Sequence, residues 1–186
     1  MKDISLIGFM GCGKSSVGKI LATLLPEYRL IDLDSYIEEK RGLTIPEIFN
    51  EYGEAAFRRM EREALEEIFR DPDRPRAILS LGGGTVTTEE CRRLIRQHTD
   101  CFYLRATTGT LLANLEGHSD GRPMLSSTQP VEASSTEVSS EREALRHRIE
   151  SMMQTRSPQY QSTAHHTIDI DGHTAAQIAA QIAAQI

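Results

Sequence analysis

Short apolar runs alternate along the chain with longer stretches in which apolar residues recur at helical spacing. The runs that predict strands cover residues 4–7, 28–34, 76–81, 101–104 and 166–170. Strands that alternate with helices favour an α/β fold with a mainly parallel sheet flanked by helices. In such a sheet, ligands gather at the carboxyl ends of the strands.

Capping signals mark where several helices begin. Thr44-Ile-Pro-Glu47 is a capping box with a proline in the first turn. Gly53 interrupts the helix that starts there, and residues 54–69 continue as an amphipathic helix. Thr87-Thr-Glu-Glu90 and Ser140-Glu-Arg-Glu143 are also expected to cap helices. The residues expected on the inner face of the helix over 54–69 are Phe57, Met60, Ala64 and Ile68.

The residue composition of the last third of the chain changes twice. A short helix is expected over 110–115, and the segment 116–140 is small, polar and poor in apolar residues, which indicates a mobile loop. Residues 175–186 repeat the letters QIAA and place isoleucines on one helical stripe. Docking onto the sheet is the simpler reading of that stripe, and a partner-binding helix is the alternative. The isoleucines are Ile178, Ile182 and Ile186.

A phosphate-binding loop lies between the first strand and the first helix. Gly8, Gly13, Lys14 and Ser15 fit the pattern G-x-x-x-x-G-K-[ST], and the helix expected over 14–25 follows at once. The glycines leave space for backbone N–H groups to reach a polyphosphate, and the positive end of the helix dipole points at the anion. Lys14 would reach the β- and γ-phosphates, and the Ser15 hydroxyl would hold Mg²⁺. A glycine turn with a surface lysine is the alternative, but the strand and helix on either side favour binding of ATP or GTP.

Size and charge narrow the classes of protein. The 186 residues are most simply one domain, and the net charge of -6 argues against a nucleic-acid partner, which favours a basic face. No run of eighteen or more apolar residues predicts a membrane span, and the N-terminus lacks the long apolar segment of a signal peptide. Cys12, Cys91 and Cys101 show no metal-ligand spacing and suit a reducing cytoplasm. The pair His165-His166 is expected to be solvated rather than metal-bound.

Polar residues follow several of the predicted strands. Asp32 and Asp34 end the second strand, and alternate strand residues share a face, although a solvated acidic turn is an equal alternative. Gly82-Gly83-Gly84 follows the third strand and permits close approach of a ligand, or forms a mere turn. Ser80 stands just before these glycines, where many phosphate-loop enzymes keep an acid that positions the metal.

Two arginines lie outside these strand ends. Arg58 is on a highly charged helix, where a surface role is the simpler reading and where Arg59 and Glu63 are expected to pair. Arg122 lies in the polar segment, and an arginine on a lid above a nucleotide can neutralise the phosphoryl group in transfer.

Taken together, these motifs resemble the shikimate kinase family over essentially the whole chain. GFMGCGKSS, DLD, FRRME, LSLGGG, GRPML and RSPQY occur in that family's order and approximate spacing. The resemblance implies a three-layer fold of the P-loop NTPase type, with a five-stranded parallel sheet and a mobile lid. It implies one domain over residues 1–186, with the lid near 116–139 and the substrate-binding helices near 35–70.

The resemblance also implies a reaction, the ATP-dependent phosphorylation of the 3-hydroxyl of shikimate in aromatic amino-acid synthesis. Mg²⁺ would be the cofactor, ATP and shikimate the ligands, and the protein a cytoplasmic monomer. The catalytic residues would be Lys14, Asp34 and Arg122. The ATP-binding residues would be Gly11, Cys12, Gly13, Lys14, Ser15, Ser16 and Arg122. The substrate-binding residues would be Asp34, Arg58, Gly82, Gly83, Gly84 and Arg156, while Ser15 and, through water, Asp32 would serve the metal.

Within this resemblance each group has a chemical task. Asp34 would orient or deprotonate the attacking hydroxyl, and Arg58 and Arg156 would hold the substrate carboxylate. The three glycines would wall the ring, and the lid would exclude water. The chain departs from the family where an arginine near adenine is common, so no residue is assigned to adenine.

The sequence leaves three rival functions, two of them kinases of other small molecules. Gluconate kinases lack the combination of F-R-x-x-E with GGG, and nucleoside monophosphate kinases need base-recognising residues that the sequence does not reveal. A regulatory nucleotide switch needs no substrate clamp, so the presence of the arginines argues against it.

Cys12 stands at a helix N-terminus beside Lys14, which favours a reactive thiolate, and a small inert residue is the alternative.

Overall fold

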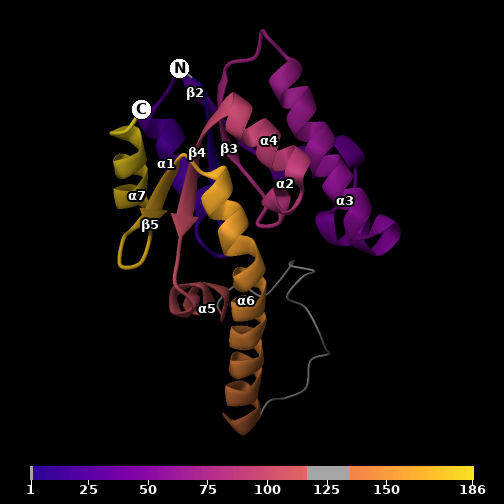
Figure 1. Cartoon of the computed structure of the whole chain (residues 1–186), viewed down its shortest axis with the longest axis vertical. Coiled ribbons are helices and arrows are strands. Elements are labelled where there is room, and N and C mark those ends of the chain that lie inside the picture. Colours follow the sequence, from indigo (N-terminus) through magenta and orange to yellow (C-terminus); the bar gives the residue numbers. More distant parts are fainter. Residues whose placement is uncertain (1, 117–134) are drawn as a thin grey trace.

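A five-stranded parallel sheet forms the centre of the molecule (Figure 1), as expected from the sequence. The computed structural model describes residues 2–116 and 135–186. The strand order is β2-β3-β1-β4-β5, and every neighbouring pair is parallel. The strands are β1 (Asp3–Ile7), β2 (Tyr28–Asp32), β3 (Arg76–Ser80), β4 (Thr99–Arg105) and β5 (His166–Asp169).

Helices cover both faces of this sheet and give three layers (Figure 1). Helices α1 and α7 pack together on one face, while α4 and α6 contact β4 on the other face, with α3 against α4. The helices are α1 (Lys14–Leu24), α2 (Leu33–Arg41), α3 (Ile45–Arg70), α4 (Glu89–His98), α5 (Thr108–Glu116), α6 (Ser135–Thr163) and α7 (Ala175–Ala183), and a 3₁₀ turn spans Thr85–Thr87. This is the predicted three-layer α/β fold.

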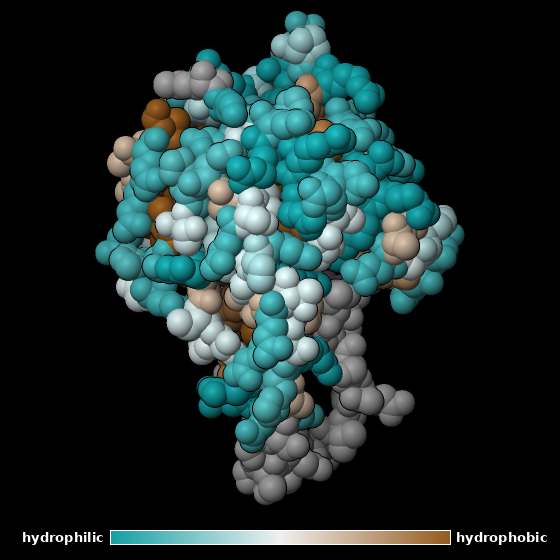
Figure 2. Space-filling view, viewed as in Figure 1, coloured by the Kyte–Doolittle hydropathy of each residue, from teal (hydrophilic) through white to brown (hydrophobic). Residues whose placement is uncertain are grey.

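The core lies between the sheet and its helices, because the central strands are apolar on both faces. All five residues of β1 are buried, and Leu6, Ile78 and Phe102 on neighbouring strands have no exposed surface. On the outside, the surface over α3 and α4 is predominantly hydrophilic (Figure 2). Across residues 2–116 and 135–186, no helix is both long enough and apolar enough to span a bilayer.

The register of the strands brings three loops together at one edge of the sheet. Ser80 of β3 pairs with Leu6 of β1 on one side and with Asp32 of β2 on the other. The loops that follow these three strands therefore start at the same level. They are the phosphate-binding loop, the acidic turn and the triple-glycine loop.

Several local predictions are confirmed in α3 and α7. Thr44 and Glu47 form the reciprocal capping box, and Gly53 takes a non-helical conformation that kinks α3. Phe57, Ala64 and Ile68 are buried, and Met60 is partly buried. In α7, Ile178 and Ile182 are buried as expected, but this helix packs mainly against α1 rather than directly on the sheet, and Ile186 lies beyond its end.

Three predicted element boundaries are wrong. The second strand ends at Asp32, because the Asp32 side chain caps α2 by accepting from the backbone N–H of Ser35. Helix α4 is capped at Thr88 rather than Thr87, since the Thr87 hydroxyl donates to Gly84 O within the 3₁₀ turn. Helix α6 begins at Ser135 rather than Ser140, and no glycine or proline separates the two positions.

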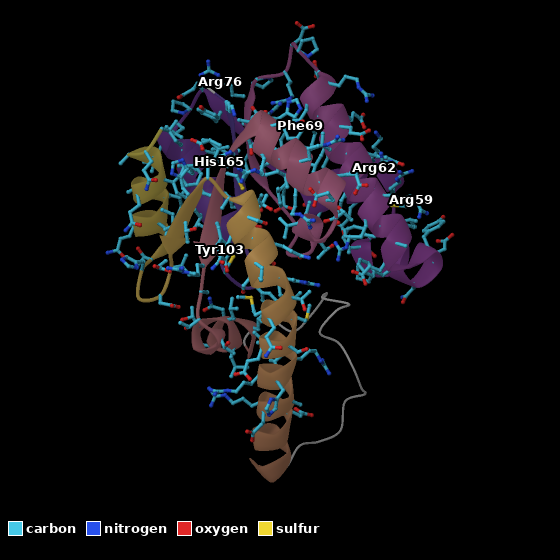
Figure 3. The ribbon with its side chains drawn as sticks, in the orientation of Figure 1. Arg59, Arg62, Phe69, Arg76, Tyr103 and His165 are labelled. Carbon is cyan, nitrogen blue, oxygen red and sulfur yellow. The ribbon has the colours of Figure 1, made fainter. Side chains whose placement is uncertain are left out.

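The predicted surface pair Arg59–Glu63 is also wrong. Glu63 pairs instead with Arg41 of α2 at 3.1 Å. Arg59 lies on the outer side of α3 (Figure 3) and is exposed. Residues 117–134 of the predicted lid near 116–139, with Arg122, fall outside the described residues, while residues 135–139 belong to α6.

Candidate active site

The loop after β1 has the backbone that a phosphate-binding loop requires. Gly13 caps α1 with a φ of 85°, in the left-handed region that favours glycine. A Cβ on Gly8 would lie 2.6 Å from the carbonyl oxygen of Leu104, so the close approach of β4 also requires glycine. The first turn of α1 then presents Lys14, Ser15 and Ser16 beside this loop.

A cavity of about 580 Å³ lies over the phosphate-binding loop. Nine of the predicted site residues line it, namely Gly11, Gly13, Lys14, Ser15, Ser16, Asp32, Asp34, Gly82 and Gly83. Nζ of Lys14 donates to the carbonyl oxygens of Gly8 and Phe9 at 2.9 and 3.0 Å. The lysine is thus held against its own loop, at the floor of the cavity.

Cys12 differs from its neighbours in the loop. Its side chain is 2 % exposed and does not line the cavity. The thiol faces Gly8, since a Cβ built there would lie 2.8 Å from Cys12 Sγ. The structure therefore favours a small packing residue over an accessible, reactive thiol at Cys12.

Oxygen groups gather beside the first turn of α1. The Ser15 hydroxyl donates to Asp32 Oδ2 at 2.9 Å and lies 3.3 Å from the Ser80 hydroxyl. Hydroxyl and carboxylate oxygens are the ligands that Mg²⁺ prefers, usually with water and substrate phosphate completing its shell. In the described part of the chain, no group of three or more His, Cys, Asp or Glu side chains forms a metal cage. The donor set fits a magnesium ion shared with a nucleotide.

A second cavity, of about 290 Å³, adjoins the first. Arg58 of α3 and Arg156 of α6 both line it, although they lie far apart in the sequence. Its wall also includes Ile45, Phe49 and Phe57, which make one side apolar. A compact ligand with a carboxylate at one end and a ring at the other suits such a cavity.

Arg58 is fixed by two carboxylates of its own helix. Its Nη1 donates to Glu61 at 2.7 Å, and its Nη2 and Nε donate to Glu54 at 2.9 and 3.3 Å. A guanidinium has five N–H donors, so these three bonds leave two donors for a ligand. The reading of Arg58 as an ordinary surface residue is wrong.

Sequence reasoning assigned no role to Glu61, the last residue of the motif FRRME, which is fully buried. Burial raises the pKa of Glu61, while Arg58 and the Thr85 hydroxyl act to lower it. Its spacing of three residues from Arg58 is the signal that could have revealed it, because such residues are neighbours on a helix.

The triple-glycine loop lies between the two cavities and lines both through Gly82 and Gly83. Gly83 O accepts hydrogen bonds from the Tyr160 hydroxyl and from Arg156 Nη1, the latter at 3.5 Å. A Cβ on Gly82 would lie 3.0 Å from both Asp34 Oδ1 and Glu61 Oε1. The sequence suggested that glycine here admits a ligand, and the structure shows that it also admits side chains of the protein.

Asp34 is at the junction of the two cavities and lines both. It lies in the first turn of α2, so the strand alternation proposed to align it with Asp32 does not apply. Burial, with help from the nearby Glu61 and Asp32, raises the pKa of Asp34 to about 7. Its Oδ1 is buried without a hydrogen-bond partner among the described residues. A buried acceptor of this kind can receive a proton from a ligand hydroxyl.

Asn114 of α5 is a further residue that sequence reasoning did not identify. Its side-chain amide donates to Gly11 O at 2.9 Å and lines the larger cavity. A polar residue within the apolar stretch TLLANL was the available signal. The amide ties α5 to the phosphate-binding loop.

The fold and these paired cavities define a small-molecule kinase of the P-loop class. The family model described as shikimate kinase matches residues 10–186. The chain therefore belongs to the shikimate kinase family.

Curated relatives agree with this assignment over nearly the whole chain. A shikimate kinase of Thermus thermophilus is 35 % identical over 179 residues, which cover 96 % of this chain and 86 % of the relative. A shikimate kinase of Enterococcus faecalis is 35 % identical over 187 residues, covering 100 % of this chain and 99 % of the relative.

Solved structures lead to the same family. A shikimate kinase from Acinetobacter baumannii in complex with shikimate gives a TM-score of 0.82 at 31 % identity, covering 98 % of this chain and 90 % of that one. The shikimate kinase from Bacteroides thetaiotaomicron gives a TM-score of 0.81 at 26 % identity, covering 99 % of this chain and 97 % of that one. A tunicamycin resistance protein of Deinococcus radiodurans, at 21 % identity and a TM-score of 0.58, shares the fold alone.

Proposed function

We propose that the protein transfers the γ-phosphoryl group of ATP to the 3-hydroxyl of shikimate, for the synthesis of aromatic amino acids. The single observation that carries this proposal is that Asp34 lines both the phosphate cavity and the arginine cavity. A phosphoryl transfer needs its two substrates to meet in line at one point.

The nucleotide phosphates occupy the larger cavity in this proposal. Backbone N–H groups of the loop from Gly11 to Gly13 and the N-terminus of α1 bind the phosphate oxygens. Lys14 exchanges its backbone acceptors for the β- and γ-phosphates and so neutralises the charge that builds up in transfer. Ser15 and, through water, Asp32 would hold Mg²⁺, which would supply charge neutralisation at the phosphates.

Shikimate occupies the smaller cavity. Its carboxylate binds Arg58 and Arg156, which approach from separate helices, and its ring packs against Gly82, Gly83 and Gly84. Two charged hydrogen-bond donors fix the ring in one orientation. The hydroxyl groups then point toward Asp34.

Asp34 acts as the general base. Its carboxylate accepts the proton of the 3-hydroxyl as the oxygen forms a bond to the γ-phosphorus and the bond from that phosphorus to the bridging oxygen of ADP breaks. With a pKa of about 7, the group is substantially ionised near neutral pH and still basic enough to take the proton.

Arg122 completes the proposed catalytic set from the lid. It lies outside the described residues, and its assignment depends on the family motif GRPML. In this role it stabilises the transferring phosphoryl group and helps to exclude water, which otherwise competes as acceptor.

The cellular location and the oligomeric state of the enzyme are also proposed. The described cysteines Cys12, Cys91 and Cys101 are all free, which suits a reducing cytoplasm. We propose a monomer in which one domain over residues 1–186 carries the whole reaction. Light scattering on the purified protein tests the oligomeric state.

A coupled assay of ADP release tests the proposed function. ATP and Mg²⁺ are supplied with shikimate, quinate, gluconate or a nucleoside monophosphate in parallel. We expect ADP release with shikimate and little with the other acceptors. ADP release that does not depend on shikimate would contradict the proposed function, and release with another acceptor would support a rival kinase.

A further inference from the structure

Thr85 lies directly after the triple-glycine loop and has no exposed surface. It begins the 3₁₀ turn, and its backbone N–H donates to Gly82 O at 3.1 Å. Its hydroxyl donates to Glu61 Oε1. Nothing in the proposed reaction so far uses this hydroxyl.

The other oxygen of Glu61 holds Arg58. Glu61 Oε2 accepts from Arg58 Nη1 at 2.7 Å, so the carboxylate links Thr85 on one side to the proposed substrate arginine on the other. Rotation of this carboxylate would move the guanidinium as well. A threonine suits the position, because its side chain is restricted in rotation and keeps the hydroxyl aimed in one direction.

The surroundings of Glu61 make a second partner important. Glu61 is fully buried, and a buried carboxylate is costly unless it is paired and hydrogen-bonded. Arg58 is shared with Glu54, so Glu61 does not have it alone. The Thr85 hydroxyl is the other donor that the structure gives to this carboxylate.

We propose that Thr85 is a positioning residue of the substrate site, whose hydroxyl fixes the Glu61 carboxylate so that Glu61 holds Arg58 ready for the carboxylate of shikimate. The inference rests on the proposed function, because it takes the ligand of Arg58 to be shikimate. Thr85 touches no substrate in this scheme and acts through two other side chains.

The protonation of Glu61 gives this role a pH signature. Removing the Thr85 hydroxyl removes a group that lowers the Glu61 pKa, so Glu61 protonates at higher pH than in the wild type. Protonated Glu61 no longer pairs with Arg58 as an ion, and the guanidinium loses its orientation. The charged or titratable groups around Glu61 are Arg58 and Glu54 of α3, Asp34 of α2 and Cys91 of α4, with Arg156 of α6 lining the same cavity.

The test compares Thr85→Val, which keeps the shape and loses the donor, with Thr85→Ser, which keeps the donor. We expect Thr85→Val to raise the KM for shikimate roughly tenfold at pH 6, in line with loss of one hydrogen bond to a charged group. The increase should be smaller at pH 8.5 than at pH 6, because raising the pH favours the ionised form of Glu61. The KM for ATP should not change, and Thr85→Ser should restore most of the shikimate affinity.

Glu61→Gln provides a second arm, because it keeps the shape and cannot ionise. Its KM for shikimate should be raised by a similar factor at both pH values. If Thr85→Val does not fold, Thr85→Ala, which also lacks the hydroxyl, takes its place in the same comparison.

The possible results separate this inference from the proposed function. A wild-type enzyme that does not phosphorylate shikimate would overturn the proposed function itself. With an active wild type, a Thr85→Val enzyme whose KM for shikimate is normal, or is raised equally at both pH values, would overturn only the role of Thr85. A parallel rise in the KM for ATP would indicate general damage and would likewise contradict the inference.

Discussion

The guanidinium of Arg58 occupies the space that a side chain at position 84 would need, so Gly84 and Arg58 lie in direct contact. A Cβ built on Gly84 would lie 2.2 Å from Nη2 of Arg58 and 2.5 Å from its Cζ, far inside contact distance. The φ of Gly84 is -108°, which any residue can adopt, so the requirement for glycine is one of space alone. The triple-glycine loop therefore sets where this arginine can lie.

Gly84→Ala should impair substrate binding more than stability. The added methyl group meets the end of a flexible side chain, which can move away at modest cost, but Arg58 is then displaced from the smaller cavity. We expect the KM for shikimate to rise about tenfold or more, the scale of one charge-assisted hydrogen bond. Steady-state kinetics and thermal unfolding of the same preparation measure the two effects.

Gly109→Ala is the matched control for this substitution. Gly109 lies in α5, and a Cβ there meets nothing closer than 3.9 Å. Its KM for shikimate should equal that of the wild type. A Gly84→Ala enzyme that binds shikimate as well as this control would show that the position of Arg58 does not matter.

Arg58→Ala and Arg156→Ala should each weaken shikimate binding while leaving ATP affinity near the wild-type value. Loss of a hydrogen bond to a charged partner in a mostly buried site costs about 1.5–3 kcal/mol. Titration calorimetry with shikimate and with a nucleotide measures both affinities. Arg59→Ala is the control, since Arg59 is exposed on the outer side of α3. Unchanged shikimate affinity in both cavity variants would show that Arg58 and Arg156 do not bind the shikimate carboxylate.

The pH dependence of the reaction should report the ionisation of Asp34. A general base must be ionised, so kcat/KM for shikimate should rise as the pH increases through about 7 and level off above it. Glu61→Gln should move this rise to lower pH, because the Glu61 charge is one of the causes that raise the Asp34 pKa. A profile that is flat between pH 5 and pH 8 in the wild type would argue against Asp34 as the base.

Asp34→Asn should abolish turnover and yet stabilise the fold at alkaline pH. The folded protein holds the Asp34 proton more tightly than the unfolded chain, so its free energy of unfolding falls as the pH rises from about 4 toward 7. A pKa raised from 3.8 to about 7 corresponds to a loss on the order of 4 kcal/mol. Asparagine does not ionise and avoids that loss.

Urea unfolding at pH 5 and pH 8 measures this effect. The difference in unfolding free energy between Asp34→Asn and the wild type should grow toward pH 8. Asp73→Asn, at an exposed position, should show no such growth. A constant difference for Asp34→Asn would mean that ionised Asp34 is not destabilising.

The sheet and the phosphate-binding loop could be predicted from the sequence because their signals are local. Strand, glycine loop and helix are adjacent in the chain, and Gly13, Lys14 and Ser15 are consecutive residues with fixed geometry. The capping box at Thr44 is equally local. Local patterns are less reliable where neighbours compete, as at Thr87, whose hydroxyl bonds within the 3₁₀ turn instead of capping α4.

The arginine cavity could be approached only through the family resemblance. Arg58 looks like a surface residue on a charged helix until Glu61 and Gly84 are seen to enclose it. The raised pKa of Asp34 depends on burial and on Glu61, which lies on another helix. Contacts of this kind join segments that are distant in the sequence, and no periodic pattern of residues indicates them.

Identification of the product tests the central claim most directly. The enzyme is incubated with ATP, Mg²⁺ and shikimate, and the phosphorylated product is characterised by phosphorus and proton NMR. The account predicts a single phosphate ester at the 3-hydroxyl, formed in equal amount to ADP and absent with Asp34→Asn. Phosphate released to water, or an ester at another hydroxyl, would contradict it.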